Sequence, residues 1–371
     1  MPPVLTKDNR RYLPAHLLKR VENALGAFEV VTTDNGLSLL IGDDGGARPL
    51  RDPILYARCW DAAKTSRLAG KAPQYEDPNH KTFRLASGLE KRRIVAVGDL
   101  HGDYESTLSV LRLARVVDGE GKWAGGSNTI FVQTGDILDR GPDSIQLLEL
   151  FPRLVREANA VGGRVIQIMG NHEVMNLIGD WRYVSEDEKG FSNAAMRRAA
   201  FSTLGRYGNR LSRLPVVHQI GDTVFAHGGI TPEWSNVNLH KINKHATDKL
   251  HEFIAAEEAD KPIPLPTVFG PDGPTWYRGY AQGPEPRVCA LLKSALAIMG
   301  AKRMVVGHTM QRDGGILSRC KGQFFVIDVG ISRALQNYQA ALEILPGGIV
   351  NAIYPYGVIS MIKRKAYEGQ P

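Results

Sequence analysis

Short apolar runs alternate with helical periodicities over most of the chain. In five places an apolar run ends next to a small residue, and polar side chains come directly afterwards. These runs span residues 94–97, 129–134, 164–169, 223–226 and 304–306. Runs of this length, bounded by turn residues, predict buried strands. After the first two, apolar residues recur at i, i+3, i+4 and i+7, which predicts helices over residues 102–117 and 143–154.

The later part of the chain changes this pattern. Helical composition covers residues 174–215, 236–258 and 288–299, whereas residues 262–286 are rich in Pro and Gly and predict an irregular loop. A further strand is predicted over residues 324–329, before a hairpin of residues 340–345 and 349–354. Strand–helix units followed by an antiparallel hairpin predict an α/β fold of two face-to-face sheets with helices outside.

The first 92 residues carry none of the recurring strand ends. Asp34-Asn35-Gly36 is a turn signal that predicts a hairpin over residues 28–41, and residues 53–68 have a helical apolar stripe. We therefore divide the chain into an N-terminal extension, residues 1–92, and a catalytic domain, residues 93–371. The extension is expected to pack on the catalytic domain.

Composition favours a globular protein with a mildly basic surface. Apolar residues make up 43% of the chain and the formal net charge is +7. That charge suits acidic substrates, and no long Lys/Arg block points to nucleic acid. Because no run of 18 apolar residues occurs, no membrane span is expected.

The cysteines and the N-terminus indicate the compartment. Cys59, Cys289 and Cys320 are scattered without a C-x-x-C pair, which predicts a reducing compartment and no disulfide framework. The N-terminus lacks a signal-peptide core, so a cytoplasmic location is expected. Residues 14–28 are weakly amphipathic and leave an organellar signal open, although Asp8 and Glu22 count against it.

Polar residues at the strand ends form the candidate chemistry. Because open α/β sheets bind ligands at the carboxyl ends of their strands, these side chains are expected to converge. Carboxylates and imidazoles together suit a divalent metal ion. A loop histidine would explain one such strand end, but five recurrences favour a shared site. The residues are Asp99, His101, Asp136, Asp139, Arg140, Asn171, His172, His227 and His308.

The ordered set GDLHG, GDILDRG, GNHE, HGG and GHT resembles the phosphoprotein phosphatase branch of the calcineurin-like metallophosphoesterases. Within that branch, GNHEVMNL with GDWRYV after it is most similar to the Shewanella-like protein phosphatases. The resemblance covers roughly residues 92–345. It implies an αββα sandwich of two mixed β-sheets flanked by helices.

The resemblance also implies a role for each motif residue. It implies two divalent metal ions, with manganese expected and iron or zinc as alternatives. The metal ligands would be Asp99, His101, Asp136 as the bridge, Asn171, His227 and His308. His172 would protonate the leaving oxygen while Asp139 orients its imidazole. The phosphate would be bound by Arg140, Asn171 and Arg278, the last from the string TWYRGY in the irregular loop.

The activity implied is a metal-dependent protein phosphatase. A hydroxide that bridges the two metals would attack phosphotyrosine, phosphoserine or phosphothreonine directly, and the partner would be a phosphorylated protein or peptide. The alternative is a dinucleoside polyphosphate or RNA-cap hydrolase of the ApaH-like kind, against which Asp139 counts. A non-catalytic scaffold and a nucleic-acid binder have less support, because the expected ligands are all present and only the charge favours nucleic acid.

The segment of residues 180–190 has two interpretations. It is charged and contains Trp181, Arg182 and Tyr183 shortly after the GNHE motif. It is either a lid beside the metal site or a solvated helical insertion.

Overall fold

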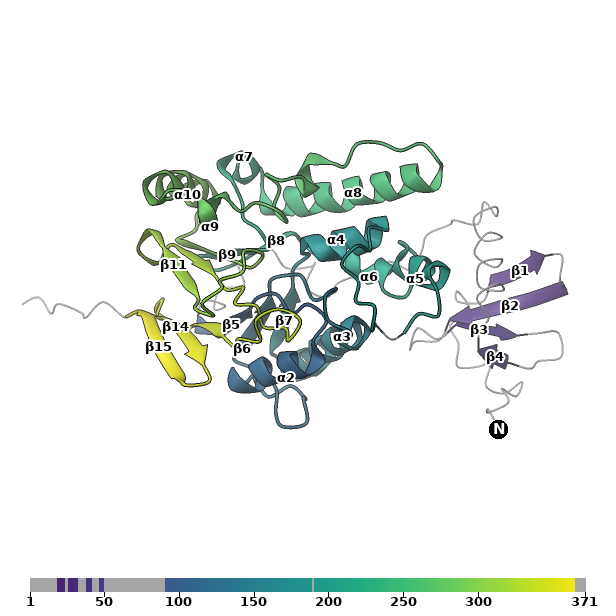
Figure 1. The fold of residues 1–371 in the computed structure, drawn as a ribbon, viewed down its shortest axis with the longest axis horizontal. Coiled ribbons are helices and arrows are strands. Elements are labelled where there is room, and N and C mark those ends of the chain that lie inside the picture. The colour runs from purple at the N-terminus through teal and green to yellow at the C-terminus, as the bar shows by residue number, and fades with distance from the viewer. Residues whose placement is uncertain are drawn as a thin grey trace, which may run out of the picture. The chain divides into compact units, whose positions relative to one another are not determined.

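The computed structural model describes residues 91–188 and 190–363, together with the backbone of four short strands near the N-terminus (Figure 1). The chain forms two compact units. One comprises residues 1–75 and 191–209, and the other comprises residues 76–190 and 210–371. The larger unit contains every predicted site residue.

A six-stranded sheet forms one half of the larger unit, in the order β15-β14-β13-β5-β6-β7. Three neighbouring strands are parallel, namely β5 (Arg93–Val97), β6 (Thr129–Gln133) and β7 (Arg164–Gln167). Antiparallel strands extend it from β5, namely β13 (Ala341–Ile344), β14 (Val350–Tyr354) and β15 (Gly357–Ile362). The predicted strands of this half and its hairpin are confirmed.

The second sheet has five strands in the order β11-β12-β10-β9-β8. Its centre is parallel, with β9 (Thr223–Ala226), β10 (Arg303–Val306) and β12 (Phe324–Val326). Its edges are antiparallel, with β8 (Val217–Ile220) and β11 (Leu317–Arg319). All residues of the three central strands are buried, as expected of strands covered on both faces.

Helices cover the outer faces of the sheets. Figure 1 shows α2 (Tyr104–Leu113) and α3 (Ser144–Ala160) beside the six-stranded sheet, and α7 (Pro232–Ser235), α8 (Leu239–Glu258) and α10 (Glu285–Met299) on the opposite side. In α3 the buried residues Leu147, Phe151 and Leu154 share one face, as the periodicity predicts. The αββα sandwich of two mixed sheets is confirmed.

Shorter helices come between these elements in the sequence. The sequence predicts a mostly helical stretch over residues 174–215. The chain instead forms three short helices there, α4 (Asn171–Ile178), α5 (Ala194–Phe201) and α6 (Gly208–Leu211). The prediction was therefore wrong for the turns between them. The irregular loop contains η4 (Thr267–Phe269) and α9 (Gly279–Gln282). None of the helices in the described part of the chain is long and apolar enough to cross a membrane.

The smaller unit contains a four-stranded antiparallel sheet. Its strands are β1 (Lys19–Asn23), β2 (Gly26–Thr32), β3 (Ser38–Ile41) and β4 (Ala47–Pro49). Thr32 pairs with Ser38, which confirms the predicted hairpin. The predicted helix over residues 53–68 lies outside the described residues. The packing of residues 1–92 on the catalytic domain stays a prediction.

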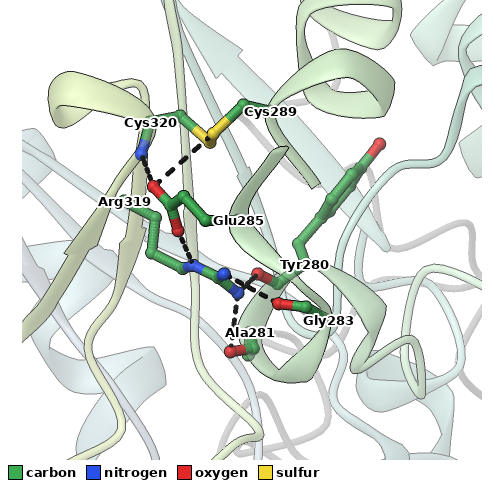
Figure 2. The surroundings of a disulfide bond; sticks show 7 residues. All are labelled: Tyr280, Ala281, Gly283, Glu285, Cys289, Arg319 and Cys320. Atoms are coloured by element: carbon green, nitrogen blue, oxygen red, sulfur yellow. Dashed lines mark hydrogen bonds and ion pairs between the residues drawn. A yellow bond between two sulfur atoms is a disulfide. The ribbon is translucent and has the colours of Figure 1, made fainter. Parts of the chain in front are cut away.

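The prediction that the cysteines form no disulfide was wrong. Cys289 in α10 and Cys320, the first residue of η5 (Cys320–Gly322), are bonded, with their Cα atoms 5.3 Å apart (Figure 2). They lie 31 residues apart in sequence, so spacing alone could not pair them. The fold brings them together because η5, which joins β11 to β12, packs against α10. Cys59 lies outside the described residues.

Candidate metal centre and active site

The carboxyl ends of strands from both sheets meet at one site. Asp99 and His101 follow β5, and Asp136 follows β6. From the second sheet, His227 follows β9 and His308 follows β10. All five side chains are buried. A cluster of buried carboxylates and imidazoles needs partners that compensate for lost hydration.

The loops that present these side chains adopt an unusual backbone conformation. Five residues of the motifs have φ in the left-handed region, which costs about 1–3 kcal/mol per non-glycine residue. They are His101 at 42°, Asp136 at 57°, Asp139 at 69°, Arg140 at 67° and His308 at 66°. Hydrogen bonds between loops hold this conformation, because the N–H groups of Leu100 and His101 both donate to the carbonyl of Asp136 at 2.9 and 3.0 Å.

Two glycines of the motifs leave room for the carboxylates. A Cβ on Gly170 would clash with Oδ1 of Asp136, and a Cβ on Gly307 would clash with Oδ1 of Asp99. The GNHE and GHT motifs therefore need glycine for close approach to the presumed ligands.

Hydrogen bonds to carbonyl groups fix the tautomers of three histidines. Nδ1 of His101 donates to the carbonyl of Leu138 at 2.9 Å, and Nδ1 of His227 donates to that of Thr134 at 2.8 Å. Nε2 of His308 donates to the carbonyl of Trp276 at 3.0 Å. The opposite ring nitrogens are therefore unprotonated when the rings are neutral, and they face the site. This arrangement orients imidazoles as metal ligands.

The unprotonated nitrogens face other acceptors with no hydrogen atom between them. Nε2 of His227 lies 3.1 Å from Nδ1 of His308 and 2.9 Å from Oδ1 of Asn171. It also lies 3.1 Å from Oδ2 of Asp136. Nε2 of His101 is 3.9 Å from Oδ2 of both Asp99 and Asp136. Lone pairs that converge in this way repel one another unless a cation binds between them, so the donor set fits metal ions.

Asp136 belongs to two possible ligand groups. One group combines it with His101 and His172, and the other with His227 and His308, with the ligand atoms of each group within 4.8 Å of one another. A carboxylate shared in this way fits a bridge between two ions.

The pKa values agree with a set of ready ligands. Burial, together with His172, lowers the pKa of His101 to about 4. Burial and then His227 lower the pKa of His308 to about 2. Both rings are therefore neutral at pH 7 and keep a free lone pair. Burial alone would raise the pKa of Asp136, but positive charge on the imidazoles around it, His227 first, outweighs burial and holds that pKa well below its usual value. The carboxylate therefore attracts positive charge, whether a protonated ring or a metal ion carries it.

Asp328 is a buried carboxylate that the sequence analysis did not select. Burial raises its pKa to about 6, and burial followed by Asp328 and Asp136 raises the pKa of Asp99 well above its usual value. Asp328 follows β12, so it carries the same signal as the other residues, an apolar strand that ends at a polar side chain. Three neighbouring buried carboxylates increase the demand for cations.

His172 and Asp139 form a hydrogen-bonded pair beside the metal ligands. Nδ1 of His172 lies 2.6 Å from Oδ2 of Asp139, whose Oδ1 accepts from Asn176 at 2.9 Å. Nε2 of His172 lies 3.8 Å from Oδ2 of Asp136. Burial opposes protonation of His172, but Asp136 and then Asp139 outweigh it and raise its pKa. The ring is therefore prepared to carry a proton on the nitrogen that faces the site.

Arg278 is anchored to the second sheet. It is the residue before α9, and its guanidinium donates to the carbonyl of His308 and to Oγ1 of Thr309. Figure 2 shows how α9 itself is held, since Arg319 donates to the carbonyls of Tyr280, Ala281 and Gly283 at 2.7–2.9 Å. Arg319 is in turn paired with Glu285 at 2.6 Å, next to the disulfide.

Residues 180–188 form turns beside the site. The interpretation of this segment as a helical insertion was therefore wrong. Its Tyr183 ring lies 5.2 Å from the ring of His172 and 4.7 Å from the guanidinium carbon of Arg140. This position suits the lid interpretation, whereas a closing motion stays a prediction.

The structure brings all ten predicted site residues into one region, although the role of each stays a prediction. The residues that sequence reasoning missed are Asp328 and Glu173. Glu173 is buried and accepts from the N–H groups of Gly170, Asp136 and Ile137 at 2.7–2.9 Å. Its place in GNHE was visible, but the sequence could not indicate that it holds the Asp136 loop.

Comparisons with known proteins agree with this geometry. The family model for calcineurin-like phosphoesterases matches residues 92–312. An uncharacterised protein of Schizosaccharomyces pombe is 36% identical over 279 residues, 72% of this chain and 82% of that protein. Shewanella-like protein phosphatase 2 of Arabidopsis thaliana is 32% identical over 307 residues, 70% of this chain and 76% of that protein.

A solved structure supports the fold independently. The cold-active protein-tyrosine phosphatase of a psychrophilic Shewanella species is 23% identical, with a TM-score of 0.63 over 93% of this chain and 98% of that chain. Because the family model covers more than half of the sequence and the Arabidopsis relative aligns along most of both proteins, the chain belongs to the calcineurin-like phosphoesterase family, in its Shewanella-like protein phosphatase branch.

Proposed function

We propose that the protein is a metal-dependent protein phosphatase that hydrolyses phosphomonoesters of phosphorylated proteins or peptides. The observation that carries the proposal is the cluster of Asp136, His227 and His308, whose possible ligand atoms all lie within 4.8 Å of one another. The names of the relatives agree, since the Arabidopsis protein is called a protein phosphatase and the Shewanella protein a protein-tyrosine phosphatase.

Two divalent metal ions would occupy this donor set. Asp99, His101 and Asp136 would hold one ion, and Asp136 would share the other with Asn171, His227 and His308. When bound, such a pair supplies an acidified water and neutralises charge on the phosphoryl group. We propose manganese, with iron or zinc as alternatives, because oxygen and imidazole donors without thiolate suit these ions.

The side chains around the metals would bind the substrate and move the proton. Arg140 and Arg278 would bind phosphate oxygens, because a guanidinium fork matches phosphate geometry, and Asn171 would add a donor. His172 would give its Nε2 proton to the leaving oxygen. Asp139 would hold the ring in orientation and favour the protonated form.

The phosphorylated residue is proposed to be phosphotyrosine, phosphoserine or phosphothreonine. The cytoplasmic location stays a prediction. Hydrolysis of dinucleoside polyphosphates is kept as an arm of the test, although the Asp139–His172 pair counts against it.

The experiment compares hydrolysis of matched phosphotyrosine, phosphoserine and phosphothreonine peptides with that of diadenosine tetraphosphate. Each is measured with Mn²⁺ and with chelator, and metal content is determined by elemental analysis. We expect metal-dependent turnover of phosphopeptides and about two ions per chain. Asp136→Asn should lose both, whereas Asp248→Asn on the exposed face of α8 should lose neither. Turnover restricted to the dinucleotide, or no bound metal in the wild type, would reject the proposal.

A further inference from the structure

Arg140 and Arg278 are held in different ways. The guanidinium of Arg278 donates to a carbonyl and a hydroxyl. Among the residues that the structure describes, the guanidinium of Arg140 has neither a hydrogen bond nor an ion pair; its side-chain contact is the ring of Tyr183, with the guanidinium carbon 4.7 Å from the ring centroid. Arg140 is exposed, and none of the described protein groups accepts a hydrogen bond from its five side-chain N–H donors.

Tyr183 also fixes the backbone of Arg140. The N–H of Arg140 donates to the carbonyl of Tyr183 at 2.8 Å, at a residue whose φ is 67°. Two contacts, one from the backbone and one from the side chain, thus join the same pair of residues.

The turn that carries Tyr183 is tied to the proton-donor side of the site. The N–H of Val184 donates to the carbonyl of Trp181 at 3.1 Å, and Nε1 of Trp181 donates to the carbonyl of Asn176 at 3.4 Å. Asn176 also donates to Asp139 at 2.9 Å. The ring of Tyr183 thus lies 5.2 Å from the imidazole of His172 and 4.7 Å from the guanidinium carbon of Arg140.

We propose that Tyr183 is a positioning residue that orients the guanidinium of Arg140 for phosphate binding by a cation–π contact. A carboxylate in its place would neutralise the charge and occupy N–H donors. The face of an aromatic ring attracts the guanidinium without accepting its N–H groups in the plane, so the donors stay available to the ligand. This inference rests on the proposed function only in taking phosphate as the ligand of Arg140.

The test measures binding of inorganic phosphate to the metal-loaded full chain by calorimetry, without any turnover. Tyr183→Leu should weaken phosphate binding by about 3- to 30-fold, the range of a cation–π contact. Tyr183→Phe keeps the ring and should remain within about twofold of the wild type. Metal content and thermal midpoint are measured for each variant, so that a folding defect is recognised separately.

A double-mutant cycle separates orientation of Arg140 from a direct role of the ring. Once Arg140→Ala has removed the guanidinium, Tyr183→Leu should cause no further loss of phosphate affinity. Additive losses would overturn the proposal. So would a loss in Tyr183→Phe equal to that in Tyr183→Leu, because the hydroxyl would then be the important group.

A kinetic comparison tests whether the ring instead contacts the leaving group. If Tyr183 orients Arg140, Tyr183→Leu lowers kcat/KM for aryl and alkyl phosphates by the same factor. A loss confined to aryl phosphates, with inorganic phosphate binding unchanged, would overturn the proposal. If the wild type hydrolyses no phosphoester, the proposed function fails, but the calorimetric cycle still decides the role of Tyr183.

Discussion

Asp136 connects most of the site at the scale of single residues. Its carboxylate lies within 3.9 Å of ring nitrogens from His101, His172 and His227. The buried carboxylate of Glu173 stabilises the loop that contains Asp136, because it accepts a hydrogen bond from the N–H of Asp136 at 2.8 Å. Burial and then Asp136 raise the pKa of Glu173 to about 7. The network therefore places negative charge where metal ions or protons must compensate for it.

Asp139→Asn should move the pH profile of the enzyme to lower pH. Asp139 helps to raise the pKa of His172, so its neutralisation lowers that pKa. The proton that His172 donates is then lost at lower pH, and the basic limb of kcat/KM should shift downward by about 1 pH unit or more.

The measurement is kcat/KM against pH for a phosphoserine peptide, whose leaving alkoxide needs the proton. The decrease in kcat/KM caused by Asp139→Asn should be smaller for an aryl phosphate, because its acidic leaving group needs the proton less. Asp313→Asn in an exposed loop serves as the control. An unchanged basic limb in Asp139→Asn would exclude His172 as the acid that this limb reports.

At the scale of elements, a strand could be predicted from the sequence when both of its faces are buried. Strands β5, β6 and β9 were visible because they are buried on both faces and read as continuous apolar runs. The edge strands β8, β11 and β15 were missed. All residues of β15 are exposed or half-buried, and Val358 and Ile359 are among the exposed ones. Pairing with a neighbour defines such edges, and a local pattern does not contain that neighbour.

Most site residues were predictable for the same reason, because they follow buried parallel strands, whereas Arg278 lies in the irregular loop before α9. Asp328 shows the limit of this approach, since it follows β12 without a motif that draws attention to it. The disulfide could not be predicted, because Cys289 and Cys320 become neighbours only after α10 packs near the edge of the five-stranded sheet. Long-range packing determines such pairs, and residue spacing does not encode it.

Removal of the Cys289–Cys320 disulfide should destabilise the larger unit. The bond closes a loop with a sequence separation of 31 residues, so the double substitution Cys289→Ser/Cys320→Ser should lower the free energy of unfolding by about 2–4 kcal/mol. The measurement is denaturant unfolding with and without dithiothreitol. Reduction should destabilise the wild type and leave the double variant unchanged. Equal stability of the oxidised and reduced wild type would contradict this expectation.

At the scale of the whole catalytic unit, the site joins the two sheets. Asp99, His101 and Asp136 extend from the six-stranded sheet, whereas His227 and His308 extend from the five-stranded sheet. The N–H of His308 donates to Oδ1 of Asp99 at 3.0 Å, which is a direct link between them. Ions bound to ligands from both sheets would therefore stabilise the packing of one sheet on the other.

Chelation should consequently lower the thermal midpoint of the folded protein. A ligand that binds the native state alone at 100 times its dissociation constant stabilises that state by about 2.7 kcal/mol per site. With two sites in a unit of this size, we expect a decrease of about 10–20 °C on removal of the metals. Loss of the ions also leaves the buried carboxylates of Asp99, Asp136 and Asp328 without compensation, which adds to the effect.

Differential scanning calorimetry with and without EDTA measures this coupling, and Asp136→Asn provides its control. The variant should unfold at the same temperature in both conditions, because it lacks the shared ligand and has no ions to lose. Re-addition of Mn²⁺ should restore the wild type alone. If EDTA removes the metals from the wild type and its midpoint does not change, the ions contribute to catalysis without holding the sheets together. The packed cores of the two sheets would then be sufficient to keep the site assembled.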